Sequence, residues 1–586
     1  MAVVNGTSEA DVLSGTDGND ELHGLESDDQ LLASAGSDLL DGGEGFDTAN
    51  YYAMGSGVSV EFGTGAATVA GSDGKVDTLV SVEKVAGSYH NDTFTVSVGG
   101  VTLDGSGGDD LYIVDAEGVT LVEENYGGYD ELRTSLNTIK MDPFIEKLTF
   151  TGTGDFKGYG NASDNEIIGG AGNDWLWGGA GADHFVGGDG YDTVSYTDSL
   201  EGVRVLDFAN YDGLTIAYGD TFTGIEAIQG SNFDDEVYLL DNAMTVDGAD
   251  GYDTVSYRQS WDGVSIDIGQ RAGAAGVTLL NVEKVIGTSF ADQFTANIAG
   301  VTLEGGMGDD VYTINSTGVS IVETDLFGGV DHVYTSLSSL HMDPFIEKMT
   351  YTGTADFTGY GNDGDNVIAS GAGNDVLFGG AGGDRFEGGA GVDTVSYEDS
   401  TEGLSVSLGW GPQSGIALYD TYIDIENLRG SHFNDVLQGD WGDNILEGGA
   451  GDDFIQGGAG ADILYGGLAS GLDGEAPQND TLIGGDGDDT YVVNAPGLVS
   501  IQDMASSYND TLIMNTIANL GQLSVTRVGD DAYLHGANDG SSGVPANGVK
   551  LVDWYVGGYN NIEHLQTADG QSYDLPATID GFAMFG

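Results

Sequence analysis

The sequence predicts an all-β fold: an elongated solenoid of the parallel β-roll or β-helix type, in which short strands alternate with tight turns. Three observations predict it. A nine-residue pattern recurs in four islands, the pattern is rich in Gly and Asp, and the segments between the islands alternate apolar and polar residues. The first island, GTSEADVLSGTDGNDELHGLESDDQLLASAGSDLLDGGEGFDTAN, begins at Gly6, and its turns close on aspartates spaced by nine residues.

Each nine-residue unit divides into a six-residue turn, G-G-x-G-x-D, and a three-residue strand, x-U-x, with a large apolar residue at U. Glycine reaches backbone angles closed to other residues, so the turn can bend tightly and direct its carbonyls at a common centre. Alternation in the strand sends only the middle side chain inward, as we expect for Leu176, Phe185 and Val194. Two units make a coil of 18 residues, and stacked coils give two parallel sheets with about 4.8 Å between rungs.

The charge of the chain requires a cation in the folded state. The sequence has 96 Asp and Glu against 15 Lys and Arg, a formal net charge of -81, and a compact fold with that charge repels itself. The turn aspartates also recur on each edge of the stack every 18 residues. A hard cation that takes six or more carboxylate and carbonyl oxygens resolves this repulsion, and Ca²⁺ fits a flexible site of that kind better than Mg²⁺. The alternative, that Gly and Asp only form good turns, does not explain the strict period.

The predicted calcium ligands are the aspartates that close the turns and the glycines of the same turns. The aspartates are Asp11, Asp20, Asp29, Asp38, Asp47, Asp110, Asp174, Asp183, Asp192, Asp253, Asp310, Asp375, Asp384, Asp393, Asp435, Asp453, Asp462, Asp480 and Asp489. The glycines are Gly170, Gly172, Gly179, Gly181, Gly371, Gly373, Gly380, Gly382, Gly449, Gly451, Gly458 and Gly460. Turns of the form G-S/T-x-x-x-D add Asp92, Asp235 and Asp292 as further candidates, whereas Asn165 and Asn444 replace the aspartate of their units.

These units resemble the RTX, or haemolysin-type, calcium-binding repeats, whose consensus is GGxGxDxUx. The resemblance implies a parallel β-roll with several calcium ions between successive turns and the Asp at position six as the side-chain ligand. Units such as GLESDDQLL and GNASDNEII depart from the consensus.

The segments between the islands are duplicated. MDPFIEKLTFTGTGDFKGYGN from Met141 matches MDPFIEKMTYTGTADFTGYGN from Met342, an offset of 201 residues. The chain therefore holds two copies of a long block and a partial third. We expect RTX blocks at 1–50, 160–195, 361–397 and 430–493, β-rich spacers at 51–159, 196–250, 251–360 (a second copy of spacer) and 398–429, and a C-terminal capping and export region at 494–586.

The C-terminal region, NGVKLVDWYVGGYNNIEHLQTADGQSYDL and the residues after it, is similar to that of type I-secreted RTX proteins. The resemblance implies an uncleaved export signal, with an ordinary solenoid cap as the alternative. The start of the chain lacks the basic and apolar regions of a cleaved signal peptide. Calcium-free repeats that repel themselves would fold only in the higher calcium outside the cell, so we expect a secreted protein, extracellular or at the cell surface.

Several classes of function are disfavoured. The few Lys and Arg are scattered, which excludes direct nucleic-acid binding. No apolar run is long enough for a membrane span, and the absence of Cys excludes disulfides and thiolate metal sites. Neither HExxH nor GxSxG is present, and the His residues are isolated. The sequence therefore predicts a protein without catalytic residues.

The expected function is that of a secreted calcium-binding structural protein that assembles with itself, as an S-layer or an extracellular filament. Its expected partners are further copies of itself and the type I secretion machinery. The alternatives are a calcium-dependent adhesin or matrix protein that binds cell-surface polysaccharide and, behind it, a carbohydrate-active enzyme. Trp175, Trp177, Trp441 and Tyr465 are expected in strands, where an exposed aromatic row would suit sugar rings or a neighbouring copy.

Overall fold

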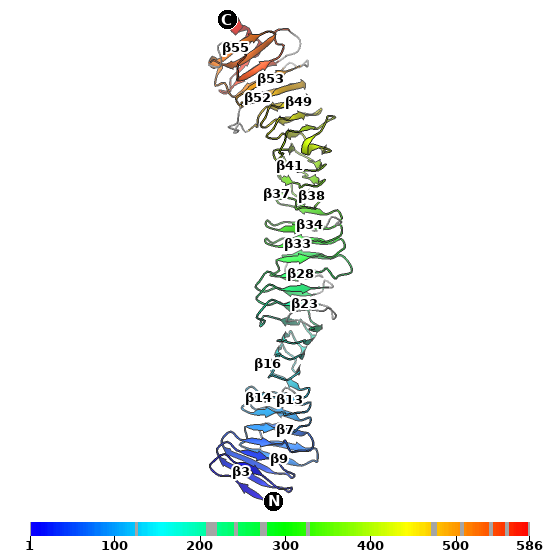
Figure 1. Ribbon diagram of the computed structural model, residues 1–586, viewed down its shortest axis with the longest axis vertical. Coiled ribbons are helices and arrows are strands. Elements are labelled where there is room, and N and C mark those ends of the chain that lie inside the picture. The colour runs from blue at the N-terminus through cyan, green and yellow to red at the C-terminus, as the bar shows by residue number, and fades with distance from the viewer. Residues whose placement is uncertain are drawn as a thin grey trace. The chain divides into compact units, whose positions relative to one another are not determined.

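The computed structural model contains two compact units, Met1–Thr288 and Ser289–Gly586, and each is described here by itself. The described residues are 2–123, 127–206, 219–239, 244–269, 278–323, 329–469, 477–503, 509–537, 543–556 and 562–583. Within each unit, short strands lie one above the other as successive rungs (Figure 1). The boundaries of the nine predicted segments remain predictions, because the structure divides the chain only into these two larger units.

Unit 1 is built from long sheets of short strands. Its first sheet runs in the order β1 (Val3–Asn5), β3 (Glu21–Glu26), β5 (Leu39–Glu44), β9 (Val76–Val80), β8 (Ala67–Gly71), β7 (Val58–Phe62), β11 (Thr93–Val96), β13 (Leu111–Val114), β15 (Glu131–Thr134), β17 (Lys147–Phe150), β19 (Glu166–Ala171), β21 (His184–Asp189) and β24 (Thr221–Thr223). The second runs in the order β14 (Thr120–Val122), β12 (Thr102–Asp104), β10 (Lys84–Ala86), β6 (Thr48–Asn50), β4 (Gln30–Leu32) and β2 (Val12–Ser14). The third has β16 (Thr138–Lys140), β18 (Lys157–Tyr159), β20 (Trp175–Trp177), β22 (Thr193–Ser195), β25 (Ala227–Gln229), β27 (Thr245–Asp247) and β30 (Thr278–Leu280). The strands β23 (Arg204–Leu206), β26 (Glu236–Tyr238), β28 (Thr254–Ser256) and β31 (Lys284–Ile286) pair in that order, and β29 spans Ser265–Ile268.

Unit 2 repeats this construction. The strands β32 (Gln293–Ala296), β34 (Val311–Ile314), β36 (His332–Thr335), β38 (Lys348–Tyr351), β40 (Val367–Ala369), β42 (Arg385–Glu387) and β45 (Thr421–Ile423) pair in order, and β33 (Thr302–Glu304) pairs with β35 (Ser320–Val322). Another sheet has β37 (Ser339–His341), β39 (Thr358–Tyr360), β41 (Val376–Phe378), β43 (Thr394–Ser396), β46 (Asn427–Arg429), β48 (Ile445–Glu447), β50 (Ile463–Tyr465), β52 (Thr490–Val493), β54 (Asp510–Met514), β58 (Ile562–Thr567) and β59 (Ser572–Asp574). The last has β44 (Ser405–Ser407), β47 (Val436–Gln438), β49 (Phe454–Ala459), β51 (Thr481–Asp486), β53 (Leu498–Gln502), β57 (Gly548–Leu551), β56 (Asp531–Gly536) and β55 (Leu523–Val528). The helix α1 spans Leu575–Ala583, and two short 3-10 turns span Gly415–Ala417 and Leu520–Gln522.

The register of the repeats confirms the 18-residue coil. Val3 lies opposite Glu21, and Glu166 lies opposite His184, in parallel pairs. The central residue of each strand points inward, so Leu176, Phe185 and Val194 are fully buried. The predicted all-β roll of parallel strands is therefore correct for the repeats.

Two regions depart from the parallel pattern. In unit 1, β7, β8 and β9 pair antiparallel. In unit 2, β55, β56 and β57 form an antiparallel group, β59 pairs antiparallel with β58, and α1 contacts β58. Short connections can join only antiparallel neighbours, because a parallel return must cross the whole coil. Hairpins therefore join β7 to β8, β8 to β9, β55 to β56 and β58 to β59, whereas other spacer strands, such as β13 and β15, pair parallel.

Trp441 also departs from expectation. It lies in the turn between β47 and β48 rather than in a strand, and it is 83% exposed. The unit GDWGDNILE places Trp441 at the third turn position, which points away from the core.

The described residues contain no helix that is both long and apolar enough to span a membrane.

Candidate metal centres

The predicted turn glycines all adopt the backbone conformation that the pattern requires. The twelve have φ between 86° and 130°, a region that other residues rarely enter. Close approach adds a second reason, because a Cβ on Gly179 would collide with the carbonyl oxygen of Asn161, one rung earlier. The turns of successive rungs are thus held in close contact.

The first glycine of each turn makes room for the turn aspartate. A Cβ on Gly178 would collide with Oδ2 of Asp183, and one on Gly169 would collide with Oδ2 of Asp174. The carboxylate therefore folds back over its own turn. The six-residue turn and its Asp form one compact cradle lined with oxygen atoms.

Successive aspartates on one edge form a carboxylate ladder. The backbone N–H of Phe156 donates to Oδ1 of Asp174 at 2.9 Å, and the N–H of Asp174 donates to Oδ1 of Asp192 at 2.9 Å. Asp183 lies on the other edge and accepts from the N–H of Asn165 at 2.8 Å. Each carboxylate thus uses one oxygen to join its rung to the rung before it.

The second carboxylate oxygen is buried without a hydrogen bond in many of these turns. Within the described part of the chain, Oδ2 has no hydrogen-bond partner in Asp29, Asp47, Asp110, Asp130, Asp174, Asp192, Asp253, Asp310, Asp375, Asp384, Asp393, Asp453, Asp462 and Asp489. A buried oxygen that carries negative charge and lacks a partner is costly. The pattern of orphaned oxygens therefore fits a bound cation.

The electrostatics of the turns point the same way. Burial, reinforced by Asp480 and Asp435, raises the pKa of Asp453 to about 8. Burial and the neighbouring Asp192 raise the pKa of Asp174 to about 6. A cation at the cradle would reverse these shifts, because it stabilises the ionised carboxylate.

Calcium fits this donor set, which is made of carboxylate and backbone carbonyl oxygens in turns stacked at 18-residue intervals. In the block at 160–195, Asp174 and Asp192 would contribute to calcium binding on one edge of the roll. Asp183 would contribute on the other edge. Bound calcium supplies the positive charge that neutralises these carboxylates. We therefore expect folding of the roll to depend on calcium binding.

In some turns, called sealed turns here, a Ser or Thr hydroxyl donates a hydrogen bond to the carboxylate of the predicted ligand. In the turn that ends at Asp435, the Ser431 hydroxyl donates to Oδ1 at 2.9 Å and the Ser431 N–H donates to Oδ2. Ser88 and Ser231 contact Asp92 and Asp235 in the same way. Thr or Ser hydroxyls contact the carboxylates of three further predicted ligands, Asp11, Asp20 and Asp38. Their role as ligands remains a prediction.

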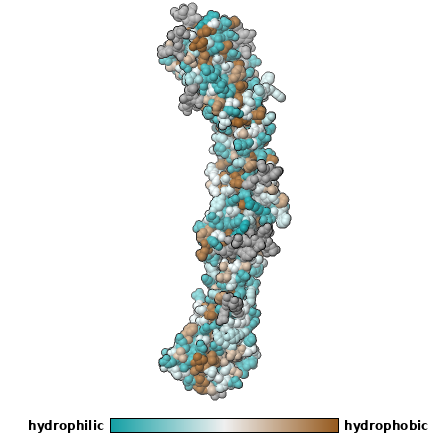
Figure 2. Space-filling model, viewed as in Figure 1, coloured by the Kyte–Doolittle hydropathy of each residue, from teal (hydrophilic) through white to brown (hydrophobic). Residues whose placement is uncertain are grey.

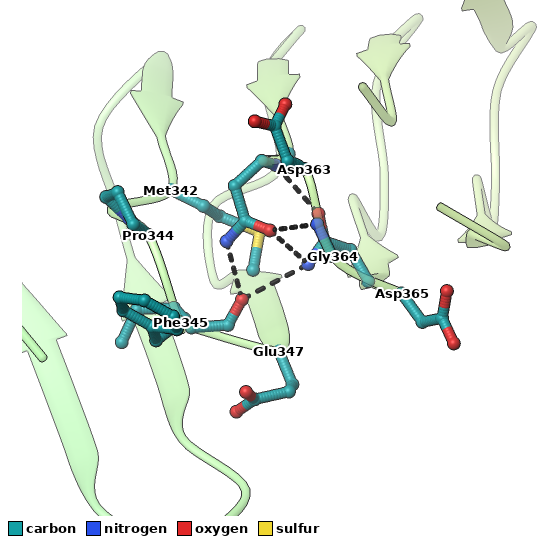
Figure 3. Close-up of a pocket in the computed structure, with 11 residues that line it drawn as sticks. Met342, Pro344, Phe345, Glu347, Asp363, Gly364 and Asp365 are labelled. Carbon is teal, nitrogen blue, oxygen red and sulfur yellow. Dashed lines mark hydrogen bonds between the residues drawn. The ribbon is translucent and has the colours of Figure 1, made fainter. Parts of the chain in front are cut away.

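In three units an asparagine side chain takes the place of the aspartate. Nδ2 of Asn366 donates to the carbonyl of Ile346 at 3.1 Å and to Oδ1 of Asn362 at 3.1 Å. This turn lines a hollow of about 650 Å³ beside Met342 and Phe345 (Figure 3). Asn165 and Asn444 make equivalent bonds to the carbonyls of Ile145 and Glu426. In these turns the amide donates a hydrogen bond to a nearby backbone carbonyl, which a carboxylate could not do.

The ladders end on residues that the sequence analysis did not single out. The N–H of Asp47 donates to Oε2 of Glu83 at 2.9 Å, and the N–H of Asp192 donates to Oε2 of Glu226 at 2.9 Å. The same role falls to Glu146, Glu283, Glu347, Glu426 and Glu563. The recurring V/I-E dipeptide in segments such as SVEKV and TGIEA was the available signal.

Other ladders end on a buried Asp–Tyr pair. The hydroxyl of Tyr196 donates to Oδ2 of Asp220 at 2.8 Å, and that of Tyr397 donates to Oδ2 of Asp420 at 2.7 Å. Tyr51 and Asp77 make a third pair at 3.1 Å. The tyrosine hydroxyl thus gives Oδ2 of the last carboxylate of the ladder a hydrogen-bond donor. These tyrosines share the pattern D-T-x-x-Y, which begins at a turn aspartate.

Comparison with known proteins identifies the repeats. The family of the RTX calcium-binding nonapeptide repeat matches residues 5–40, 14–49, 159–194, 360–395, 423–455, 438–470 and 477–495. None of the curated proteins compared with the chain matches it. The matched regions contain the cradles and most of the carboxylate ladders described above, and these repeats bind calcium between turns. The chain therefore carries RTX calcium-binding nonapeptide repeats in several separate regions.

Proposed function

We propose that this protein is a secreted, calcium-loaded structural protein that assembles with itself at the cell surface, as an S-layer lattice or an extracellular filament. RTX repeats are typical of secreted proteins. The proposal gives the calcium-clamped solenoid itself the functional role, and it assigns no catalytic residue. The observation that carries it is a recurring apolar side chain at the exposed turns.

Apolar residues are exposed at the turns that close on ladder aspartates. Phe46, directly before Asp47, is 48% exposed, and Phe233, two residues before Asp235, is 46% exposed. Phe433 takes the position of Phe233 in unit 2 and is 44% exposed. The residues Tyr129, Tyr191, Tyr252, Val330 and Val392 are also exposed directly before a ladder aspartate. Exposed apolar side chains at a repeated position are typical of association surfaces.

The surface around these residues is acidic. The face seen in Figure 2 carries separate hydrophobic patches in a largely hydrophilic surface, and the chain has a net charge of -81. Two such surfaces repel each other unless a cation lies between them. Calcium therefore supports association twice, by fixing the turns and by screening the charge between copies.

Electron microscopy and light scattering with calcium and after chelation test the proposal. We expect ordered assemblies in calcium that disperse on chelation. The variant Phe46→Ser, Phe233→Ser, Phe433→Ser should keep its calcium-dependent circular dichroism and lose assembly. The control variant Val76→Ser, Val80→Ser, Val436→Ser changes apolar residues that are equally exposed on strands, and it should still assemble. A wild-type protein that stays monomeric in calcium would contradict the proposal.

One observation favours an adhesin as the second candidate. Tyr159 on β18 stacks on Trp177 on β20 with ring centroids 4.4 Å apart, and Trp175 lies 5.9 Å from Trp177. Unit 2 has His341, Tyr360 and Phe378 in the equivalent strands, with centroids 3.8 Å and 4.7 Å apart. Partly exposed rings that form a row across strands suit the faces of sugar rings.

Co-sedimentation with insoluble polysaccharides separates the two candidates. An adhesin should bind in calcium, and Trp177→Ala should weaken binding while the oligomeric state stays the same. Failure of the wild-type protein to bind any polysaccharide would exclude this candidate. Release of reducing ends from the same polysaccharides would contradict both candidates, because it would indicate an enzyme.

A further inference from the structure

We propose a second kind of metal site in this protein, built from three carboxylates and lying outside the matched nonapeptide repeats. It is made by Asp110, Glu123 and Asp130 in unit 1 and by Asp310, Glu323 and Asp331 in unit 2. In each triad the ligand atoms lie within 4.8 Å of one another. The site would hold a hard, oxygen-binding divalent cation, with Ca²⁺ as the first choice.

The three side chains of a triad come from different strands. Asp110 directly precedes β13, Asp130 directly precedes β15, and Glu123 directly follows β14. β13 and β15 are neighbours in one sheet, whereas β14 belongs to another. A cation at this point would therefore join two sheets, whereas the turn sites join successive turns along one edge.

The triads are buried. Asp110, Glu123 and Asp130 are 2%, 8% and 1% exposed, and Asp310, Glu323 and Asp331 are 0%, 7% and 2% exposed. Three carboxylates so close together in a buried site repel one another strongly. Burial of this cluster is therefore costly unless positive charge accompanies it.

The hydrogen bonds leave oxygen atoms directed into the triad. Oδ1 of Asp110 accepts from the N–H of Asp92 at 2.6 Å, and Oδ1 of Asp130 accepts from the N–H of Asp110 at 2.8 Å. Oδ2 of each aspartate has no hydrogen-bond partner among the described residues. Oδ2 of Asp310 is in the same situation in unit 2. These orphaned oxygens, on side chains more than nine-tenths buried, point to a missing ligand.

A tyrosine and a glycine complete the site. The hydroxyl of Tyr112 donates to Oε1 of Glu123, which orients the glutamate. A Cβ on Gly105 would collide with Asp110, Glu123 and Tyr112 together. Tyr312 and Gly305 repeat this arrangement around Glu323 in unit 2. The same construction in two separate units indicates a built site.

The donor chemistry determines the class of ion. All the side-chain donors are carboxylate oxygens, which hard cations prefer. Mg²⁺ usually keeps several waters, which a buried triad disfavours, whereas Ca²⁺ takes protein oxygens at variable geometry. The absence of Cys from the chain and of His from the triads disfavours softer metals.

Glu→Gln substitution in the full chain tests the site, because Gln keeps the shape and can still accept from Tyr112. Calcium content is measured by elemental analysis after equilibrium dialysis. We expect Glu123→Gln and Glu323→Gln each to bind one ion fewer than wild type, and the double variant two fewer, one for each triad. The control Glu117→Gln alters an exposed glutamate in a nearby turn and should bind as wild type does. Calcium content that stays unchanged in the double variant would overturn the proposal.

A second measurement decides the matter if the Gln variants fail to fold. Terbium replaces calcium at oxygen sites, and its emission is sensitised by a tyrosine close to the ion. The variant Tyr112→Phe, Tyr312→Phe keeps all six carboxylates and should lose part of the tyrosine-sensitised emission at equal bound terbium. Emission equal to that of wild type would show that no ion lies beside these tyrosines, and it would overturn the proposal.

Discussion

The turn that ends at Asp174 closes on a carboxylate, whereas the turn that ends at Asn165 closes on an amide, and the two side chains make different hydrogen bonds. Both continue the backbone ladder, since the N–H of Asp174 donates to Asp192 and the N–H of Asn165 donates to Asp183. Asp174 keeps one buried oxygen without a partner, whereas the Nδ2 of Asn165 donates to the carbonyl of Ile145 at 3.1 Å. An amide thus converts a cation cradle into a neutral, hydrogen-bonded turn. The solenoid thus contains both aspartate turns with an unpaired buried oxygen and asparagine turns whose amide is hydrogen-bonded.

The largest expected effect is that of calcium removal. Chelation should abolish most of the β signal in circular dichroism, because unpaired buried carboxylates then oppose folding. Hydrogen exchange at limiting calcium should show that amides near Asp174 and Asp192 lose protection before those near Asn366. A spectrum that chelation leaves unchanged would contradict the coupling of metal and fold. If amides in the aspartate turns and in the asparagine turns lost protection at the same calcium concentration, the proposed difference between the two kinds of turn would be contradicted.

The pH dependence without calcium comes next in size. Burial raises the folded-state pKa of Asp183 to about 7, of Asp174 to about 6 and of Asp453 to about 8, all above the ordinary value of 3.8. The folded chain then binds more protons than the unfolded chain between these values, so its stability rises as the pH falls through this window. In chelator, we expect the β signal in circular dichroism to increase as the pH is lowered from 8 to 5.

The same titration in saturating calcium is the control for the pH effect. Protons compete with the ion for the carboxylates, so acidification should release calcium and lower thermal stability. The Asn turns carry no charge at this position and should contribute to neither change. A loss of β structure on acidification in chelator would contradict the assignment of raised pKa values.

Replacing Asn165 by Asp should convert one kind of turn into the other. The new carboxylate would face the carbonyl of Ile145 without a hydrogen to donate, at a cost of about 1–3 kcal/mol in the free energy of unfolding at limiting calcium. Saturating calcium should restore the stability and add bound metal. The control Asn137→Asp alters an exposed residue and should change neither quantity. A variant that binds no further calcium would indicate that the amide alone does not decide the type of turn.

The smallest expected effect is at the sealed turn of Ser431. Ser431→Ala removes the hydroxyl bond to Oδ1 of Asp435 and should lower stability in calcium by about 1 kcal/mol. Thermal denaturation measures it, with Thr64→Ala, at an exposed position, as the control. Calcium content should stay as in wild type, because the Ser431 N–H still contacts the carboxylate. A loss of bound calcium would instead place Asp435 among the ligands.

Much of the site could be predicted from local spacing. The nine-residue period placed Asp174 and Asp192 on one edge and Asp183 on the other, and it placed Leu176 in the core, as the structure confirms. Glu123 and Asp130 were missed because no nine-residue unit contains them. Their signal was the duplicated order of Asp, Tyr, Glu and Asp in the segments that begin GGDDLYIV and GMGDDVYTI.

The sequence by itself determined the calcium-binding repeat, the rung length, the parallel strands and the buried residue of each strand, because all of these follow from a short period repeated along the chain. Only the tertiary structure decided which oxygen of each aspartate stays unpaired, where a ladder ends on Glu226 or on the pair of Tyr196 and Asp220, and where hairpins replace coils. The partner of Asp183 along the ladder is Asp220, 37 residues away. Such pairings depend on the path of the intervening loop, and a local pattern does not encode that path.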